Sequence, residues 1–253
     1  MPNYAPGTPL WIDHASPDVA ASARFYSELF GWQAEDLGEQ MGHYTMFRQG
    51  GKSVAAATPL MSPQQPTVWS TYISTTSAED TAKKVTDAGG SVISAPMQIM
   101  DQGTMAFFAD PGGAAFGVWQ PDQMTGAELV NTPVSLSWNE LSTRDMAAAK
   151  AFYTKVFPWT AHGNPMPDGN EYVEWQIDGK SIGGGMTMGP QFPPQVPPFW
   201  LVYFAVANAD NTVKRAQELG AKVMSPAMDI PQGRMAVLTD PQGASFGVIQ
   251  LKG

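Results

Sequence analysis

The chain has no cysteine, few charged residues and only three histidines among its 253 residues. The absence of cysteine excludes disulfide bonds, thiolate metal sites and cysteine nucleophiles. Lys and Arg total 14 against 23 Asp and Glu, which gives a formal net charge of −9. This charge repels nucleic-acid backbones and anionic bilayers, and no cluster of basic residues offers a local exception. We therefore expect neither nucleic acid nor a membrane as a partner.

Long apolar runs are also missing from the sequence. Nowhere do about 18 apolar residues follow one another, and the N-terminus has neither a basic start nor an apolar stretch. With 43% hydrophobic residues, the chain is nevertheless apolar enough to fold around a core. These features predict a soluble cytoplasmic protein, and a monomer or a homodimer is compatible with them.

What the chain does contain is an internal repeat. The segment Trp11-Ile12-Asp13 returns 127 residues later as Trp138-Asn139-Glu140, and Phe25-Tyr26 returns at the same distance as Phe152-Tyr153. The repeat continues to the end of each half, where Asp110–Gln120 returns 130 residues later. A period this long exceeds the ~20 to 50 residues of solenoid units, so it indicates two homologous domains that can each bury a core.

We place the two domains at residues 1–125 and 126–253, and each divides again into two modules. Alternating polarity at Pro9–Asp13 predicts a strand, and Ser16 followed by proline and an acid predicts a helix start with a capping hydroxyl. That helix should end near Phe30. Further strands are expected at 44–47, 53–57, 68–74, 91–94, 105–109, 115–120, 172–175, 181–185 and 200–207, with helices at 78–88 and 210–219. Strand, helix and three strands thus occur four times.

This order resembles the vicinal oxygen chelate superfamily, which includes glyoxalase I, bleomycin-resistance proteins and extradiol dioxygenases. The resemblance rests on the Phe-Tyr pair of each first helix and on the closing Asp-Pro-x-Gly-Ala-x-Phe-Gly strand. It implies an α+β fold in which four βαβββ modules form two tandem glyoxalase-like domains with cup-shaped mixed sheets. The cups would be the sites. The sequence leaves open whether modules pair within or across the halves.

Most catalytic members of this family hold a divalent metal in the cup, and the resemblance gives the positions of its ligands. The first-strand ligand, usually histidine, corresponds to Trp11 and Trp138. The last-strand ligand, usually glutamate, corresponds to Gly117 and Gly247. None of these side chains can bind a cation. We therefore predict no metal ligands and no cofactor, which argues against glyoxalase I and dioxygenase chemistry.

Asp13 and Glu140 are the candidate catalytic residues. Alternation along a strand puts each of them on the same face as an indole, and burial beside aromatic rings would raise the carboxyl pKa. The alternative is a solvated carboxylate at a strand end. His14 should point to the opposite face, and its copy Leu141 favours a packing role for it.

Aromatic side chains are the candidate ligand-binding residues, because rings bind flat apolar molecules with little loss of entropy. Core packing explains many of them equally well. The first cup should be the more aromatic of the two, since Trp119 corresponds to Ile249. The candidates are Trp11, Phe47, Trp69, Tyr72, Phe108, Trp119, Trp138, Trp175, Trp200 and Tyr203.

Three functions are compatible with these residues. The first is a metal-free protein that binds an apolar or aromatic metabolite, as the architecture of bleomycin-resistance proteins implies. The second is a metal-independent isomerase, lyase or cyclase with Asp13 or Glu140 as general base. The third is an enzyme similar to lactoylglutathione lyase that recruits a metal through other residues.

Overall fold

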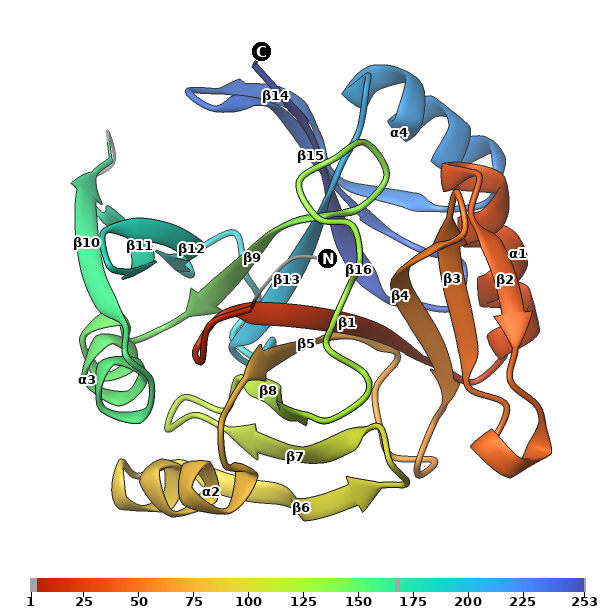
Figure 1. Ribbon diagram of the computed structural model, residues 1–253. Helices are drawn as coiled ribbons and strands as arrows, with labels where there is room; N and C mark the ends of the chain where they lie inside the picture. Colours follow the sequence, from red (N-terminus) through yellow and green to blue (C-terminus); the bar gives the residue numbers. More distant parts are fainter. Residues whose placement is uncertain (1–3, 167–168, 253) are drawn as a thin grey trace.

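The computed structural model describes residues 4–166 and 169–252, which form two eight-stranded mixed sheets and four α-helices (Figure 1). The strand–helix–three-strand order recurs four times, so the predicted fold of four βαβββ modules is confirmed. None of the helices in these ranges is long and apolar enough to cross a membrane.

The first half contains two modules. The first module comprises β1 (Pro9–Ser16), α1 (Val19–Phe30), β2 (Gln33–Asp36), a short 3-10 turn (Glu39–Met41), β3 (Thr45–Gln49) and β4 (Lys52–Pro59). The second comprises β5 (Val68–Ser74), α2 (Ala78–Asp87), β6 (Ser91–Ile99), β7 (Gly103–Ala109) and β8 (Ala115–Pro121). Their strands form one sheet in the order β2-β3-β4-β1-β5-β8-β7-β6.

The second half repeats this arrangement. Its first module comprises β9 (Leu136–Thr143), α3 (Met146–Val156), β10 (Thr160–Pro165), β11 (Glu171–Ile177) and β12 (Lys180–Thr187). Its second module comprises β13 (Phe199–Ala205), α4 (Ala209–Glu218), β14 (Lys222–Ile230), β15 (Gly233–Thr239) and β16 (Ser245–Leu251). The order is β10-β11-β12-β9-β13-β16-β15-β14, so modules share a sheet within each half.

Helix α1 shows how the sequence sets an element's limits. Its cap is Asp18, whose side chain accepts from the backbone N–H of Ala21, so the expected cap at Ser16 is wrong. The Ser16 hydroxyl instead hydrogen-bonds to Ser22 at 2.7 Å. Gly31 ends the helix in the left-handed conformation, with φ of 75°, where a glycine avoids the steric cost of a side chain.

The hydrophobic cores do not follow the halves. One core combines α1 and its strands with β13, α4, β15 and β16, while the other combines β5, α2, β7 and β8 with α3 and its strands. The expectation that each half buries a core of its own is therefore wrong for these two clusters. The backs of the two sheets and their helices pack against each other instead. The domain limit between residues 125 and 126 stays a prediction.

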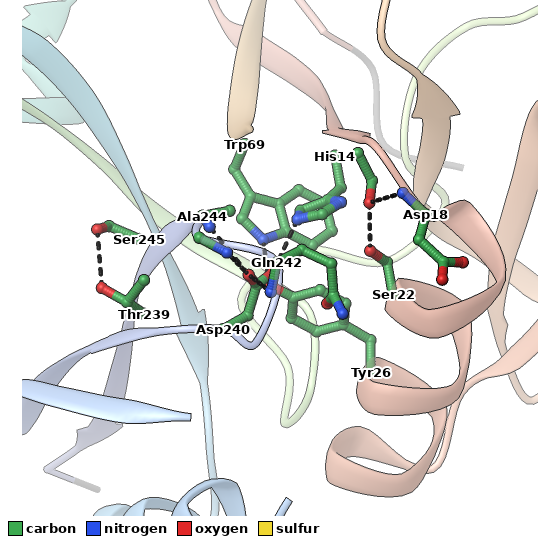
Figure 2. Close-up of polar contacts among 12 residues, drawn as sticks. His14, Asp18, Ser22, Tyr26, Trp69, Thr239, Asp240, Gln242, Ala244 and Ser245 are labelled. Atoms are coloured by element: carbon green, nitrogen blue, oxygen red, sulfur yellow. Dashed lines mark hydrogen bonds and ion pairs between the residues drawn. The ribbon is translucent and has the colours of Figure 1, made fainter. Parts of the chain in front are cut away.

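A buried polar network joins the halves within the first of these cores (Figure 2). The Tyr26 hydroxyl of α1 donates to Asp240 Oδ2 at 2.8 Å, and His14 Nε2 lies 2.7 Å from the same oxygen. Trp69 Nε1 donates to the Tyr26 hydroxyl at 2.7 Å. The second carboxylate oxygen accepts from the backbone N–H groups of Gln242, Gly243 and Ala244.

The second core contains the copy of this network, with one difference. Tyr153 donates to Asp110 at 3.1 Å, and Trp200 donates to Tyr153 at 2.9 Å. The position of His14 is taken by Leu141, which is fully buried. The Phe-Tyr pair and the Asp-Pro turn thus recur because each half's helix binds the turn of the other half.

Candidate functional site

The candidate site lies on the sheet faces that point away from the shared cores. We call the face of the first sheet that carries Trp11 and Asp13 the first cup. The face of the second sheet that carries Trp138 and Glu140 is the second cup. Strand alternation places each carboxylate two residues from its indole on the same face, as the sequence predicted.

In the first cup, Asp13 belongs to a group of four polar side chains. The Tyr72 hydroxyl donates to Asp13 Oδ2 at 2.7 Å, and Trp11 Nε1 donates to the Tyr44 hydroxyl at 2.9 Å. Tyr44 also hydrogen-bonds to Asp13. The buried carboxylate therefore accepts from two phenols, one of which is held in turn by an indole. We call this group, Trp11, Tyr44, Asp13 and Tyr72, the first quartet.

The second cup contains the same group with glutamate in place of aspartate. The Tyr172 hydroxyl donates to Glu140 Oε2 at 2.8 Å, and the Tyr203 hydroxyl donates to Oε1 at 3.1 Å. Trp138 Nε1 donates to Tyr172 at 2.8 Å. We call Trp138, Tyr172, Glu140 and Tyr203 the second quartet.

Burial controls the protonation of both quartets. It raises the pKa of Asp13 to about 6, although hydrogen bonds from Tyr72, Ser70 and Tyr44 oppose the rise. Burial likewise raises the pKa of Glu140 against the hydrogen bonds from its two tyrosines. The pKa of Tyr203 is raised well above its ordinary value by burial and by the nearby Glu140. The phenols therefore remain donors, and the carboxyls titrate closer to neutral pH than usual.

Glycines stand at the last-strand positions where the family usually has a ligand glutamate, and they leave space for the tyrosine rings. Gly117 pairs with Tyr72, and Gly247 pairs with Tyr203, on neighbouring parallel strands. A Cβ at Gly117 would lie 2.6 Å from the Tyr72 ring, and one at Gly247 would lie 2.1 Å from the Tyr203 ring. The phenol rings therefore occupy the space into which a ligand glutamate would extend.

This donor set does not fit the divalent metal that the family implies. Each quartet offers one carboxylate, and its oxygens already accept hydrogen bonds from phenols. Across residues 4–166 and 169–252, no three His, Asp or Glu side chains are grouped so that they could hold a metal ion. A borderline metal such as zinc requires three or four such ligands. Neither quartet therefore offers the ligands that a metal-dependent step would need.

The two cups differ in what lies over them. After β8 the chain crosses β1 on its way to β9 (Figure 1), and the N–H of Ala127 donates to the carbonyl of Leu10 at 2.8 Å. Trp119 Nε1 donates to the Met124 carbonyl, and Tyr4 donates to the Ala127 carbonyl. These residues pack in one cluster with Trp11 and Tyr72. The linker therefore covers the Trp11 side of the first cup, while Tyr44, Met105 and Phe107 stay half-buried.

The second cup is lined by its own sheet. Its apolar cluster contains Leu201, Tyr203 and Ile249 with Trp138, Phe199, Ile230, Met235 and Val237, all on strands β9 and β13 to β16. Trp138 is half-buried, whereas its copy Trp11 is only 3% exposed. Ile249 replaces Trp119, so the first cup is the more aromatic, as expected.

A compensating pair of residues accommodates the longer acid of the second cup. Asp13 pairs with Ala56 on β4, whereas Glu140 pairs with Gly184 on β12. A Cβ at Gly184 would lie 2.0 Å from the Tyr172 hydroxyl and 2.8 Å from Trp138 Nε1. The methylene group added to the acid in the second cup is therefore matched by a methyl group removed from the facing strand.

The structure separates the predicted ligand-binding residues into two groups. Five of them lie on the cup faces, namely Trp11, Tyr72, Trp119, Trp138 and Tyr203. The other five lie in the shared cores, on the opposite face of the sheets, where packing accounts for them. They are Phe47, Trp69, Phe108, Trp175 and Trp200, each at most 8% exposed.

Sequence reasoning missed Tyr44 and Tyr172 as site residues. Tyr44 and Tyr172 both stand near the start of the same strand in each half and repeat at nearly the same shift as the indoles. That repetition was the available signal. Phe107 packs edge-on to Tyr72 with ring centroids 5.1 Å apart, whereas the predicted Phe108 points to the other face of β7.

Comparison with known proteins agrees with this architecture. Residues 10–118 and 135–248 match the model of the Glyoxalase/Bleomycin resistance protein/Dioxygenase superfamily. The Mn(II)-bound glyoxalase of Novosphingobium aromaticivorans is 17% identical, with a TM-score of 0.65 over 98% of this chain and 83% of that one. The 2,3-dioxygenase LapB of Pseudomonas sp. KL28 is 13% identical, with a TM-score of 0.66 over 97% of this chain and 93% of that one.

Similarity in sequence is higher to two kinds of bacterial protein. The "Anthracycline biosynthesis protein DnrV" of Streptomyces peucetius is 42% identical over 100% of this chain and 96% of its own length. The "Putative glyoxylase CFP32" of Mycobacterium tuberculosis is 40% identical over 98% of this chain and 96% of its own length. With its two matched repeats, the chain belongs to the glyoxalase/bleomycin resistance protein/dioxygenase superfamily as a tandem two-domain member.

Proposed function

We propose that the protein binds a flat, mostly apolar aromatic metabolite in its second cup, without a metal ion. The observation that supports this most is the replacement of the family's metal positions by a quartet of indole, two phenols and one carboxylate. In the second cup this quartet lies beside apolar residues of the sheet, with Trp138 half-buried. Such rings offer large contact area at little entropic cost.

The kind of ligand is suggested by the relatives. A protein that is 42% identical over 96% of its own length is named for anthracycline biosynthesis, which favours a fused-ring aromatic compound. The net charge of −9 agrees with a small-molecule ligand rather than nucleic acid. A cytoplasmic location and a monomeric or homodimeric state stay predictions.

Titration with quinizarin, a dihydroxyanthraquinone, tests the proposal through tryptophan fluorescence. We expect saturable quenching with one molecule bound per chain. The variant Trp138→Phe should lose most of the signal change and weaken binding, while the matched variant Trp11→Phe in the first cup, where the linker covers the indole, should retain both. Absence of saturable quenching by quinizarin and related fused-ring compounds, in protein shown to be folded by circular dichroism, would defeat the proposal.

Metal-independent catalysis by Glu140 is a second candidate, because its buried carboxyl has a raised pKa and two phenols beside it. A carboxyl of this kind can act as a general base. Turnover would then be abolished in Glu140→Gln with ligand binding retained, and it would persist in Asp13→Asn. An activity similar to lactoylglutathione lyase with a recruited metal has less support, because the quartets lack the donor set for it.

A further inference from the structure

The second quartet restricts the chemistry of the ligand that the proposed function assigns to this cup. Its three side-chain donors are all directed inward. The Trp138 N–H is donated to Tyr172, and the Tyr172 and Tyr203 hydroxyls are both donated to Glu140. What the quartet can still offer to a ligand is acceptor capacity, because a carboxylate has about four acceptor positions and here two are occupied by phenols.

A second acidic side chain, Glu174, lies near the second quartet. Glu174, on the strand that carries Tyr172, contributes to the raised pKa of Tyr172 after burial and Glu140. Glu174 itself accepts from Ser181 at 2.6 Å and lies near Asn164 of β10. Two carboxylates therefore act on this side of the cup, and an anion placed beside Trp138 would be repelled by both.

We infer that the second cup selects a neutral or cationic aromatic ligand that brings its own hydroxyl or amine hydrogen-bond donor to Glu140, and that it rejects anionic ligands. The inference rests on the proposed binding function. The donor of the ligand would reach the free acceptor positions of Glu140 or the oxygen of Tyr203. A ligand that carries only acceptors would force the tyrosines to leave the carboxylate, and a buried carboxylate without partners is costly.

Three naphthalene derivatives that differ in one substituent test this selection by isothermal titration calorimetry. Naphthol carries a donor, its methyl ether carries only an acceptor, and naphthoate carries a negative charge. A hydrogen bond to a charged group contributes roughly 1.5–3 kcal/mol, so naphthol should bind on the order of 10- to 100-fold more tightly than the ether. Naphthoate should bind more weakly than the ether.

Two amide variants show which cup is responsible for the preference for a hydrogen-bond donor. In Glu140→Gln, the preference for naphthol over its ether should fall at least roughly fivefold, because the amide is uncharged and its N–H₂ group competes as a donor. In the matched variant Asp13→Asn, both affinities should stay within about twofold of the wild type, since the linker buries the indole of that cup.

The outcomes separate the inference from the function on which it rests. Equal affinity for naphthol and its ether, with binding retained, would overturn the selection for a donor while leaving the binding function intact. Tighter binding of naphthoate than of the ether would overturn the exclusion of anions. If Asp13→Asn changed the preference for naphthol over its ether and Glu140→Gln did not, the assignment to the second cup would be overturned. Absence of heat with all three compounds and with quinizarin would defeat the proposed function itself.

Discussion

The first cup and the second cup hold the same quartet, yet they differ in what surrounds it. In the first, the linker and Tyr4 pack over Trp11 and Tyr72. In the second, the apolar neighbours of the quartet belong to the sheet itself. In one copy of a duplicated site the indole is thus buried under a linker, while in the other copy it stays half-buried. Similar sequences in the two halves therefore do not imply equal roles.

The contrast between the halves extends to the two buried networks that join them. Asp240 accepts five hydrogen bonds, including those from Tyr26 and His14, whereas Asp110 accepts from Tyr153 and from the N–H groups of Gly112, Gly113 and Ala114. The two networks therefore differ mainly by the histidine. The differences between the two cups and between the two networks can be tested by four sets of variants, which follow in order of decreasing effect on stability.

Replacing the aspartates of the two Asp-Pro turns should have the largest effect on stability. Asp240→Ala leaves buried donors without partners and should lower the free energy of unfolding by roughly 3–5 kcal/mol. Asp110→Ala should cost less, because fewer donors lose their partner. Urea unfolding followed by tryptophan fluorescence measures both. Equal losses would show that His14 adds nothing to the first network.

Acid titration tests whether the first cup is closed around its carboxyl. Burial raises the pKa of Asp13 to about 6, while an aspartate in an unfolded chain titrates near ~3.9. The folded state therefore holds this proton more tightly. The contribution of Asp13 to stability is fully present below pH ~4 and falls by about 3 kcal/mol as pH rises through the folded pKa.

The variant Asp13→Asn isolates this contribution, because an amide does not titrate in this range. Urea unfolding between pH ~4 and ~7 should show a decline in the wild type that the variant lacks. The matched variant Glu140→Gln should remove a decline of the same sign, since burial raises that pKa as well. Parallel stability curves for the wild type and Asp13→Asn would mean that solvent reaches the first carboxyl.

Sequence reasoning predicted the fold in most of its parts. The limits of β5 were predicted to the residue, and the strands on either side of the Asp-Pro turns were found because polarity alternates and turns bound them. The edge strand β2 was missed, since Gln33–Asp36 is exposed along its whole length and shows no apolar alternation. An edge strand paired on one side leaves little hydrophobic pattern to detect.

The candidate site was predicted in part, for a related reason. Alternation placed Trp11 with Asp13 and Trp138 with Glu140 because residues two apart on a strand share a face. Alternation could not show which face of each sheet packs against the other half. Trp69 and Trp200 lie on that face and therefore belong to the shared cores. Nor could alternation show that the linker covers the Trp11 side of one cup, since that contact depends on tertiary packing.

A double-mutant cycle in the second cup tests the compensation between acid and glycine. Gly184→Ala should be destabilising by about 1–3 kcal/mol, because the added methyl group meets the Tyr172 hydroxyl. Glu140→Asp shortens the acid and should weaken its bonds to the tyrosines. The double variant recreates the Asp and Ala pair of the first cup, so its loss should be smaller than the sum of the single losses. Additive losses, measured by urea unfolding, would contradict the compensation.

Replacing His14 by its copy should make the first network behave like the second. Burial acts to raise the pKa of Asp240, but hydrogen bonding and charge from His14, with the bonds from Tyr26 and Ala244, outweigh it and leave the pKa lowered. Without a histidine, burial raises the pKa of Asp110. His14→Leu should therefore reverse the direction of the Asp240 shift.

The effect of this variant on stability should be small near neutral pH and should depend on pH. About 1 kcal/mol is expected, because the lost hydrogen bond to Asp240 is offset by removing a buried His14 Nδ1 that has no partner in the described part of the chain. A lowered carboxyl pKa contributes stability above the unfolded pKa and loses it as pH falls, and a raised one does the opposite. The advantage of the wild type over His14→Leu should therefore start to shrink as pH falls toward ~4, where the raised pKa stabilises the variant, and shrink further below ~4, where the wild type loses stability. The reciprocal variant Leu141→His should lower the pKa of Asp110. A difference in stability between wild type and His14→Leu that does not change with pH would show that the two networks are already equivalent.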